Sequence, residues 1–296
     1  MATTQLDIGA RYPAETYHGR YSPEATWGII LVIPFLVVFL LFVLFPVLYG
    51  LWLGSNPASY HKLFADPVYR RTIINTAIFL GVGINLKLFL ALLLSAYFAS
   101  TKPWIRWLGV IFILPWAVPS IPTILSFRWM LNSEWGMLNN LLMLFGWDNP
   151  PFWLVKPHFA LGAVIAVHIW KYLPFWTLIL LAGRMAIPLD YYEAAKVDGA
   201  TPLQRFTYVT WPQLRNLYLT STLLSTIWSL GDFNSVYLLT GGGPGEQTHV
   251  LATLGIRYAF NLTEIDTGIA TVMTALPVLV PLVIILVMRL GKRAQQ

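Results

Sequence analysis

One apolar stretch of the chain, residues 217–239, carries side chains that suit a polyhydroxylated molecule. Ser225, Trp228, Ser229 and Asp232 stand at i, i+3, i+4 and i+7, so they share one face of a helix. An indole ring can stack on such a molecule, while hydroxyl and carboxylate oxygens exchange hydrogen bonds with its hydroxyl groups. A charge inside a bilayer costs about 2.5–3.5 kcal/mol on insertion scales, which marks Asp232 as a candidate functional residue. For the two serines, the alternative interpretation is packing between helices. For Asp232, the alternative is simple contact with water near the outer third of the span.

A second face of the same kind is predicted in residues 160–182. It holds His168, Lys171, Tyr172 and Phe175. Lys171 is expected either to snorkel outward or to pair with Asp232. Lys87, in another apolar run, is expected to snorkel or to pair within the helix bundle. Four tryptophans are interpreted as a belt at the membrane interface, namely Trp104, Trp107, Trp129 and Trp176.

A polar segment between two apolar runs has the pattern helix, tight turn, helix. Pro188 suits the first position of the first helix, and Gly199 ends it as a left-handed terminator. Thr201 and Gln204 fit a capping box at the start of the second helix. Pro212 is expected to close that second helix. Each helix has about 11 residues and reaches roughly 16 Å, which is too short to cross a bilayer.

This segment has the properties of a docking surface. Ala194 and Ala195 allow close approach, Glu193 offers a charge to a basic partner, and Phe206 and Tyr208 offer apolar anchors. The alternative is an amphipathic helix that rests on lipid headgroups, but such helices collect Lys and Arg on their polar face. The acids fall close to the anchoring side here, which favours docking.

The elements that position these residues must be membrane helices. Hydrophobic residues make up 57% of the 296 residues and charged residues 11%, against about 25% charged in a soluble domain. There is no cysteine, which excludes disulfides and thiolate metal sites. Runs of about 20 apolar residues predict membrane-spanning helices. Six are expected, at about 27–49, 73–98, 107–129, 160–182, 217–239 and 268–289.

The third of these runs contains Pro115, Pro119 and Pro122, which must kink or break it. Lys and Arg favour the side of the membrane that holds the polar segment and both termini, which is therefore predicted to be cytoplasmic. The net charge of +6 then reflects membrane topology and not a nucleic-acid surface. The N-terminus is a poor secretory signal, so an uncleaved first span is expected.

The domain organisation follows from these runs. We expect a cytoplasmic segment over residues 1–26, an all-α domain of six transmembrane helices over 27–290 with a cytoplasmic loop at 183–216, and a cytoplasmic tail over 291–296.

The polar segment resembles a known motif. "EAAKVDGATPLQRFTYVTWP" is similar to the EAA motif of ABC importer permeases, although Trp211 replaces a usual Leu and Asn216 a common Pro. The matching residues are Glu193, Ala194, Ala195, Asp198, Gly199, Ala200, Phe206, Val209 and Pro212. Four further stretches resemble the maltose-type sugar importer permeases: "NTAIFL", "ILPWAVPS", "RWMLNSEWGMLN" and "LLTGGGPGEQT". The resemblance covers roughly residues 27–290.

The resemblance implies a permease in the bacterial cytoplasmic (inner) membrane that acts with other chains. These are a second, homologous permease, two ATPase subunits that bind ATP and Mg, and a solute-binding protein outside the cell. The loop would carry the coupling helix that the ATPase moves, with Glu193, Ala194, Ala195, Asp198 and Gly199 as the coupling residues. A sugar-like solute would pass along Tyr172, Phe175, Ser225, Trp228, Ser229 and Asp232. This chain would hold no cofactor of its own.

Three other classes of protein are weighed against this interpretation. A membrane enzyme would need convergent catalytic groups, and neither a zinc-protease spacing nor a phosphate-binding loop with Lys–Ser/Thr is present. An ion-coupled secondary transporter would show an inverted repeat, and none is visible. A permease for glycerol-phosphate, polyamine or a similar solute stays open.

Overall fold

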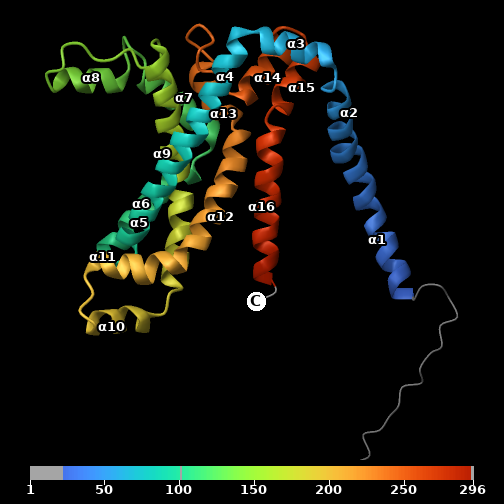
Figure 1. Cartoon of the computed structure of the whole chain (residues 1–296). Helices are drawn as coiled ribbons and strands as arrows, with labels where there is room; N and C mark the ends of the chain where they lie inside the picture. The colour runs from blue at the N-terminus through green and yellow to red at the C-terminus, as the bar shows by residue number, and fades with distance from the viewer. Residues whose placement is uncertain (1–22, 101, 295–296) are drawn as a thin grey trace, which may run out of the picture. The chain divides into compact units, whose positions relative to one another are not determined.

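The computed structural model describes residues 23–100 and 102–294, and in these ranges all regular structure is helical. Contacts divide the chain into two units, residues 1–52 and 53–296. In the first unit, α1 (Pro23–Phe39), a π-helical turn (Leu40–Leu44) and the start of α2 (Phe45–Leu53) follow without a break (Figure 1). Residues 27–53 are apolar enough to cross a membrane, and no side chain in their most apolar window is buried within the chain.

The second unit contains two further long apolar helices. Residues 67–98 are continuous through α4 (Pro67–Ile78), a π-helical segment (Phe79–Ile84) and α5 (Asn85–Phe98). The other is α9 (Pro157–Met185), which has 29 residues. Bent pairs add two candidates: α6 (Pro103–Ala117) with α7 (Ser120–Met130), and α15 (Ile265–Met273) with α16 (Leu276–Ala294). By length and composition, the described residues thus hold three spanning helices, or up to five if each bent pair is one span.

The run predicted as one span at 217–239 is two helices in the structure. α12 (Trp211–Leu230) ends at Gly231, and α13 (Phe233–Thr240) starts after Asp232. The carboxylate of Asp232 accepts a hydrogen bond from the backbone N–H of Ser235 at 3.1 Å, which makes Asp232 the N-cap of α13. The polarity that marked this residue as functional therefore also breaks the helix.

One part of the core of the second unit lies where α5 and α9 pack. Leu88 and Ala91 of α5 and Trp176 and Leu180 of α9 are buried in one cluster with Leu214 of α12. This packing fixes the three helices relative to one another within the unit.

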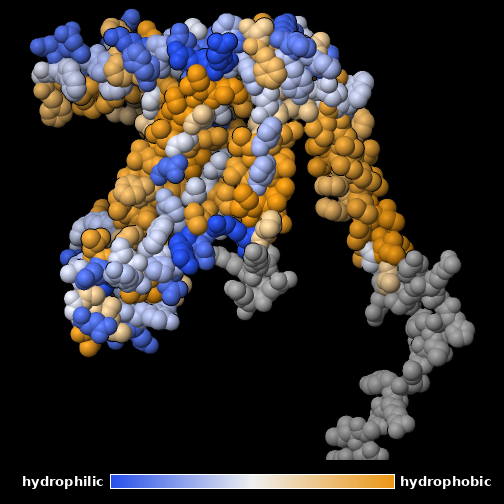
Figure 2. Space-filling view, viewed as in Figure 1, coloured by the Kyte–Doolittle hydropathy of each residue, from blue (hydrophilic) through white to orange (hydrophobic). Residues whose placement is uncertain are grey.

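Hydrophobic residues cover the middle of the second unit, and hydrophilic residues gather at its two ends (Figure 2). One end carries α10 (Leu189–Val197) and α11 (Pro202–Arg205); the opposite end carries α3 (Pro57–Ala65), α8 (Met137–Leu144) and α14 (Leu251–Ile256) (Figure 1). The polar hairpin and the two long loops around 130–159 and 240–267 therefore lie on opposite sides of an apolar band.

The Gly-rich loop between α13 and α14 is fastened to α4. The side-chain amide of Asn75 donates to the carbonyls of Gln247, at 2.7 Å, and His249, at 3.1 Å. Gly242 has φ +89°, and a Cβ there would lie 2.1 Å from the ring of His249. Burial and the nearby Arg257 lower the pKa of His249 to about 4, so the ring packs as a neutral group at neutral pH.

The break between α6 and α7 is stabilised by a lysine from α9. Lys171 is buried, and its ammonium donates to the carbonyls of Pro115 at 2.8 Å, Trp116 at 3.3 Å and Val118. The prolines predicted a kink or break here, and the structure has a bend of 94°. Lys171 was predicted either to snorkel outward or to pair with Asp232, and both predictions were wrong. The carbonyls at the end of α6 have no partner within the helix, so they accept hydrogen bonds from the Lys171 ammonium instead.

We expect Lys171→Met to lower the free energy of unfolding by about 1–3 kcal/mol, since methionine fills similar space but leaves the carbonyls at the end of α6 without this donor. The measurement is thermal unfolding of the purified chain in detergent. Lys62→Met is the matched control, because Lys62 pairs with Glu264 at 2.5 Å in an exposed position. Equal stability of Lys171→Met and the unaltered chain would contradict this role.

Candidate functional site: a cavity between the helices and an exposed hairpin

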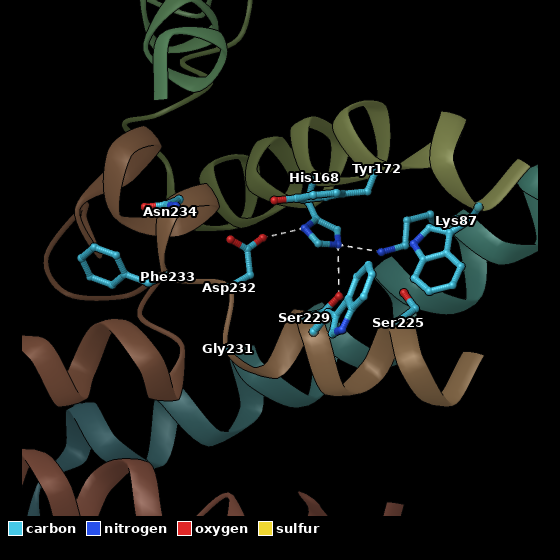
Figure 3. Close-up of a pocket in the computed structure, with 11 residues that line it drawn as sticks. Lys87, His168, Tyr172, Ser225, Ser229, Gly231, Asp232, Phe233 and Asn234 are labelled. Atoms are coloured by element: carbon cyan, nitrogen blue, oxygen red, sulfur yellow. Dashed lines mark hydrogen bonds and ion pairs between the residues drawn. The ribbon is translucent and has the colours of Figure 1, made fainter. Parts of the chain in front are cut away.

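A cavity of about 380 Å³ lies between α5, α9, α12 and the start of α13. Its size is within the range of small-molecule sites. The residues that line it come from all four elements (Figure 3). They are Lys87, His168, Tyr172, Trp176, Ser225, Trp228, Ser229, Gly231, Asp232, Phe233 and Asn234.

The structure brings five of the six residues proposed for the solute path to this cavity. Tyr172, Ser225, Trp228, Ser229 and Asp232 line it. The sixth, Phe175, does not; its ring instead contacts the rings of Trp116 at 5.4 Å and Trp228 at 5.6 Å, so it backs the wall of the cavity.

Three ionisable side chains from different helices form a chain of contacts along one wall (Figure 3). Lys87 Nζ lies 2.8 Å from His168 Nε2, and His168 Nδ1 lies 2.7 Å from Asp232 Oδ2. An ammonium only donates, so Nε2 accepts and Nδ1 carries the proton that is donated to Asp232. The order of donation is therefore Lys87 to His168 to Asp232, and it links α5, α9 and the α12–α13 junction.

Aromatic rings form another part of the lining. The rings of Trp176 and Trp228 lie 5.6 Å apart, and the Lys87 ammonium lies 5.7 Å from the ring of Tyr172. Trp228 is 56% exposed within the chain, so its ring is open to a bound molecule. Trp176 was predicted in an interface belt, and this is wrong: it is 2% exposed, because α5 packs over the side of α9 that carries it.

Sequence reasoning missed most of the charged wall. Lys87 was expected to snorkel or to pair, and it pairs; but neither its histidine partner nor its place at the cavity was foreseen. His168 was placed on the right face of α9 but was not chosen as a site residue. The available signal was a lysine and a histidine within separate apolar runs. Periodicity within one helix does not show which residues of another helix it meets.

The polar hairpin has the predicted helix–turn–helix form. α10 ends before Gly199, which has φ +73°, and Thr201 and Gln204 form the capping box that starts α11. The residues assigned to coupling gather on α10 and its turn: Glu193, Ala194, Asp198 and Gly199 are exposed and Ala195 is partly exposed. Glu193 forms no ion pair with the residues that the structure describes.

Two details of the hairpin differ from prediction. Pro188 is the N-cap of α10 and not its first residue. Pro212 does not close the second helix: α11 continues through a π-helical turn (Phe206–Thr210) into α12. The wider turn, in which Trp211 N–H bonds to Phe206 O, accommodates a residue without an N–H.

Phe206 and Tyr208, the two predicted apolar anchors, differ in burial. Phe206 packs against the core cluster that contains Trp176 and Leu214, whereas Tyr208 is 79% exposed. Exposed apolar side chains do gather on the hairpin, at Leu189, Val197 and Leu203. The outer surface available to a partner is therefore this set together with Tyr208.

No group of three His, Cys, Asp or Glu residues in the described part of the chain is arranged to hold a metal ion. The chemistry that this arrangement supports is the binding of a polar molecule between membrane helices. Apolar helices around such a cavity define the class of a multi-pass membrane transport protein.

Comparison with known proteins gives the family. Residues 88–294 match the model of the binding-protein-dependent transport system inner membrane component. The chain belongs to this family, the permeases of ABC importers. It is 32% identical to the trehalose/maltose transport system permease protein MalF of Thermococcus litoralis over 260 residues, which cover 83% of this chain and 88% of that protein. It is also 32% identical to the sulfoquinovosyl glycerol transport system permease protein SmoG of Agrobacterium fabrum, over 78% of this chain and 75% of that one.

A solved structure has the same fold. It is the bacterial alginate ABC transporter in complex with an alginate pentasaccharide-bound periplasmic protein, with a TM-score of 0.76, 22% identity, and coverage of 90% of this chain and 93% of that one. As a member of this family, the chain is a multi-pass inner-membrane permease component.

Proposed function

We propose that this chain is the permease subunit of an ATP-driven importer that receives a sugar or related polyol and passes it inward. The observation that carries the proposal is the cavity, which combines Trp228 and Trp176 with hydrogen-bonding groups between helices of an apolar unit. Apolar sugar faces stack on aromatic rings, and sugar hydroxyl groups need donors and acceptors.

The relatives support a sugar as the solute class. The names of the two relatives refer to trehalose and maltose and to sulfoquinovosyl glycerol. That of a third permease, 30% identical and from Rhizobium radiobacter, refers to lactose. The family match is to transport systems that depend on a binding protein, which favours this class over an ion-coupled secondary transporter.

The partners are a second homologous permease, two ATPase subunits and a solute-binding protein. The bound periplasmic protein in the alginate transporter structure supports the last of these. ATP and Mg belong to the ATPase chains. The apolar side chains of residues 27–53 would be covered by lipid and by the second permease.

The hairpin would couple ATP hydrolysis to the cavity. Ile187, at its start, is buried in the cluster that also holds Trp176 and Leu214. Tyr192 OH lies 3.0 Å from Thr210 Oγ1, which joins α10 to the turn that enters α12. Movement of the hairpin therefore reaches α9 and α12, the two helices that carry most of the cavity lining. In this mechanism the cavity opens alternately to the two sides of the membrane.

The hairpin and both termini are placed in the cytoplasm, and α3, α8 and α14 outside. This orientation follows from the distribution of Lys and Arg. α12 would complete a sixth span with α13, since its 20 residues reach about 30 Å.

Replacing the exposed tryptophan tests the solute site. We expect Trp228→Ala to lower sugar uptake at least about tenfold, because the ring that stacks on the solute is lost; tenfold corresponds to about 1.4 kcal/mol. The measurement is uptake of a panel of labelled mono- and disaccharides by cells that carry the complete importer. Trp129→Ala is the control, since Trp129 is 68% exposed on α7 and does not line the cavity. If no sugar requires this chain for uptake, the proposed function is wrong.

A further inference from the structure

The charged wall of the cavity leaves hydrogen-bond donors unused. The Lys87 ammonium has three N–H groups and is 1% exposed, and among the described side chains its one hydrogen-bonding partner is His168. The hydroxyl of Ser225 is buried and has no hydrogen-bond partner in the described part of the chain. Both side chains line the same cavity. Buried donors without acceptors cost free energy, so this wall is suited to a ligand that supplies acceptors.

The carboxylate of Asp232, in contrast, has most of its acceptor positions occupied by hydrogen bonds from the protein itself. Oδ2 accepts from His168 Nδ1 at 2.7 Å and from Ser235 Oγ at 2.5 Å, and Oδ1 accepts from Ser235 N at 3.1 Å. A carboxylate has about four acceptor positions, so three of them are occupied. Asp232 therefore positions His168 and offers little to a solute.

The charges of Asp232 and Lys87 differ in how far the protein itself compensates them. Asp232 caps α13, where the helix dipole and three donors balance its negative charge. The imidazole of His168 stands between it and Lys87 (Figure 3). The positive charge of Lys87 lies at the other end of this chain of contacts, in the cavity that Ser225 also lines. Within the described part of the chain, no carboxylate forms an ion pair with Lys87.

We infer that Lys87 and Ser225 bind an anionic group of the solute, so that the sugar taken by this permease carries a carboxylate or a similar acidic group. This inference rests on the proposed function and names the substrate class of the same cavity. Trp228 then holds the ring of the sugar while Lys87 selects for its charge.

The test is a binding titration of the full chain in lipid nanodiscs, followed by tryptophan fluorescence from the cavity. The probes are glucuronate and glucose 6-phosphate, with glucose as the neutral sugar of the same ring. We expect the unaltered chain to bind the better of the two anionic probes at least about tenfold more tightly than glucose. Lys87→Met should bind the two anionic probes no more tightly than glucose. Lys87→Arg should keep the preference for the anionic probe, because arginine keeps the positive charge.

Ser225→Ala provides a variant that removes no internal hydrogen bond. It should weaken binding of the preferred anionic probe about threefold or more, and weaken glucose binding by a smaller factor. Lys62→Met, an exposed lysine outside the cavity, is the control for loss of charge and should behave like the unaltered chain.

Three results would overturn the inference: equal binding of acidic and neutral sugars by the unaltered chain, an acidic preference that survives in Lys87→Met, or a uniform loss of all three affinities in that variant, which indicates a structural role. Glucose binding without an acidic preference overturns this inference alone and leaves the proposed function standing. Binding of no probe overturns this inference, and the uptake panel then decides the proposed function separately.

Discussion

Uptake by the complete importer is expected to fall to background when Glu193 is replaced by glutamine or alanine. Glu193 is exposed on α10, beside the small residues Ala194 and Ala195. In the proposed mechanism it supplies the charge that holds the hairpin to a basic residue of the ATPase. An ATPase bound to α10 can move α9 and α12 only while its contact with Glu193 is intact. The measurements are solute uptake, co-purification of the ATPase, and the amount of this chain in the membrane.

The glutamine variant separates charge from shape, because it keeps the length of the side chain. Asp190→Asn is the matched control: this residue is also acidic and exposed in the same helix but lies one turn earlier. We expect the control to transport and the Glu193 variants to insert normally, lose the ATPase and stop transporting. Normal uptake by Glu193→Gln would refute the coupling role.

The second large effect is expected at Asp232. Asp232→Asn keeps a side chain that can cap α13 but removes the negative charge that balances Lys87 through His168. Removing one member of a buried charged pair typically costs about 3–5 kcal/mol, because the other charge stays buried without compensation. We expect a clear fall in the thermal stability of the purified chain and loss of uptake.

A double-variant cycle shows whether the charges are coupled. Lys87→Met combined with Asp232→Asn leaves no charge in this wall, so the double variant should be more stable than Asp232→Asn alone. Its uptake should stay low, since a donor for the solute is missing. Additive losses of stability would show that Lys87 and Asp232 act independently, contrary to the contacts through His168.

The hairpin was largely predictable because its signals are local. A left-handed glycine, a capping box and a run of polar residues act within a few positions, and Gly199, Thr201 and Gln204 behave as predicted. The prediction failed at Pro212, where a π-helical turn changes the hydrogen-bond pattern. No residue type signals such a turn reliably, since it depends on how the two flanking helices are held.

The shared face of Ser225, Trp228 and Ser229 was equally predictable, because helical spacing fixes it. Lys171 and Trp176 were not. Lysine and tryptophan are both common at membrane interfaces, so residue type alone predicts that position for each of them. Packing of α9 against α5 and α6 places both inside instead, Lys171 beneath the carbonyls of Pro115, Trp116 and Val118 and Trp176 in the core.

The sequence by itself determined that this is a helical membrane protein and where its apolar runs lie. It also determined that the polar hairpin lies outside those runs. Hydrophobicity, helix period and capping depend on neighbours along the chain, so they can be read without the tertiary structure. Only the tertiary structure decided that Lys87, His168 and Asp232 meet. They are separated by 81 and 64 positions, and a contact over such separations depends on the register and rotation at which three helices pack.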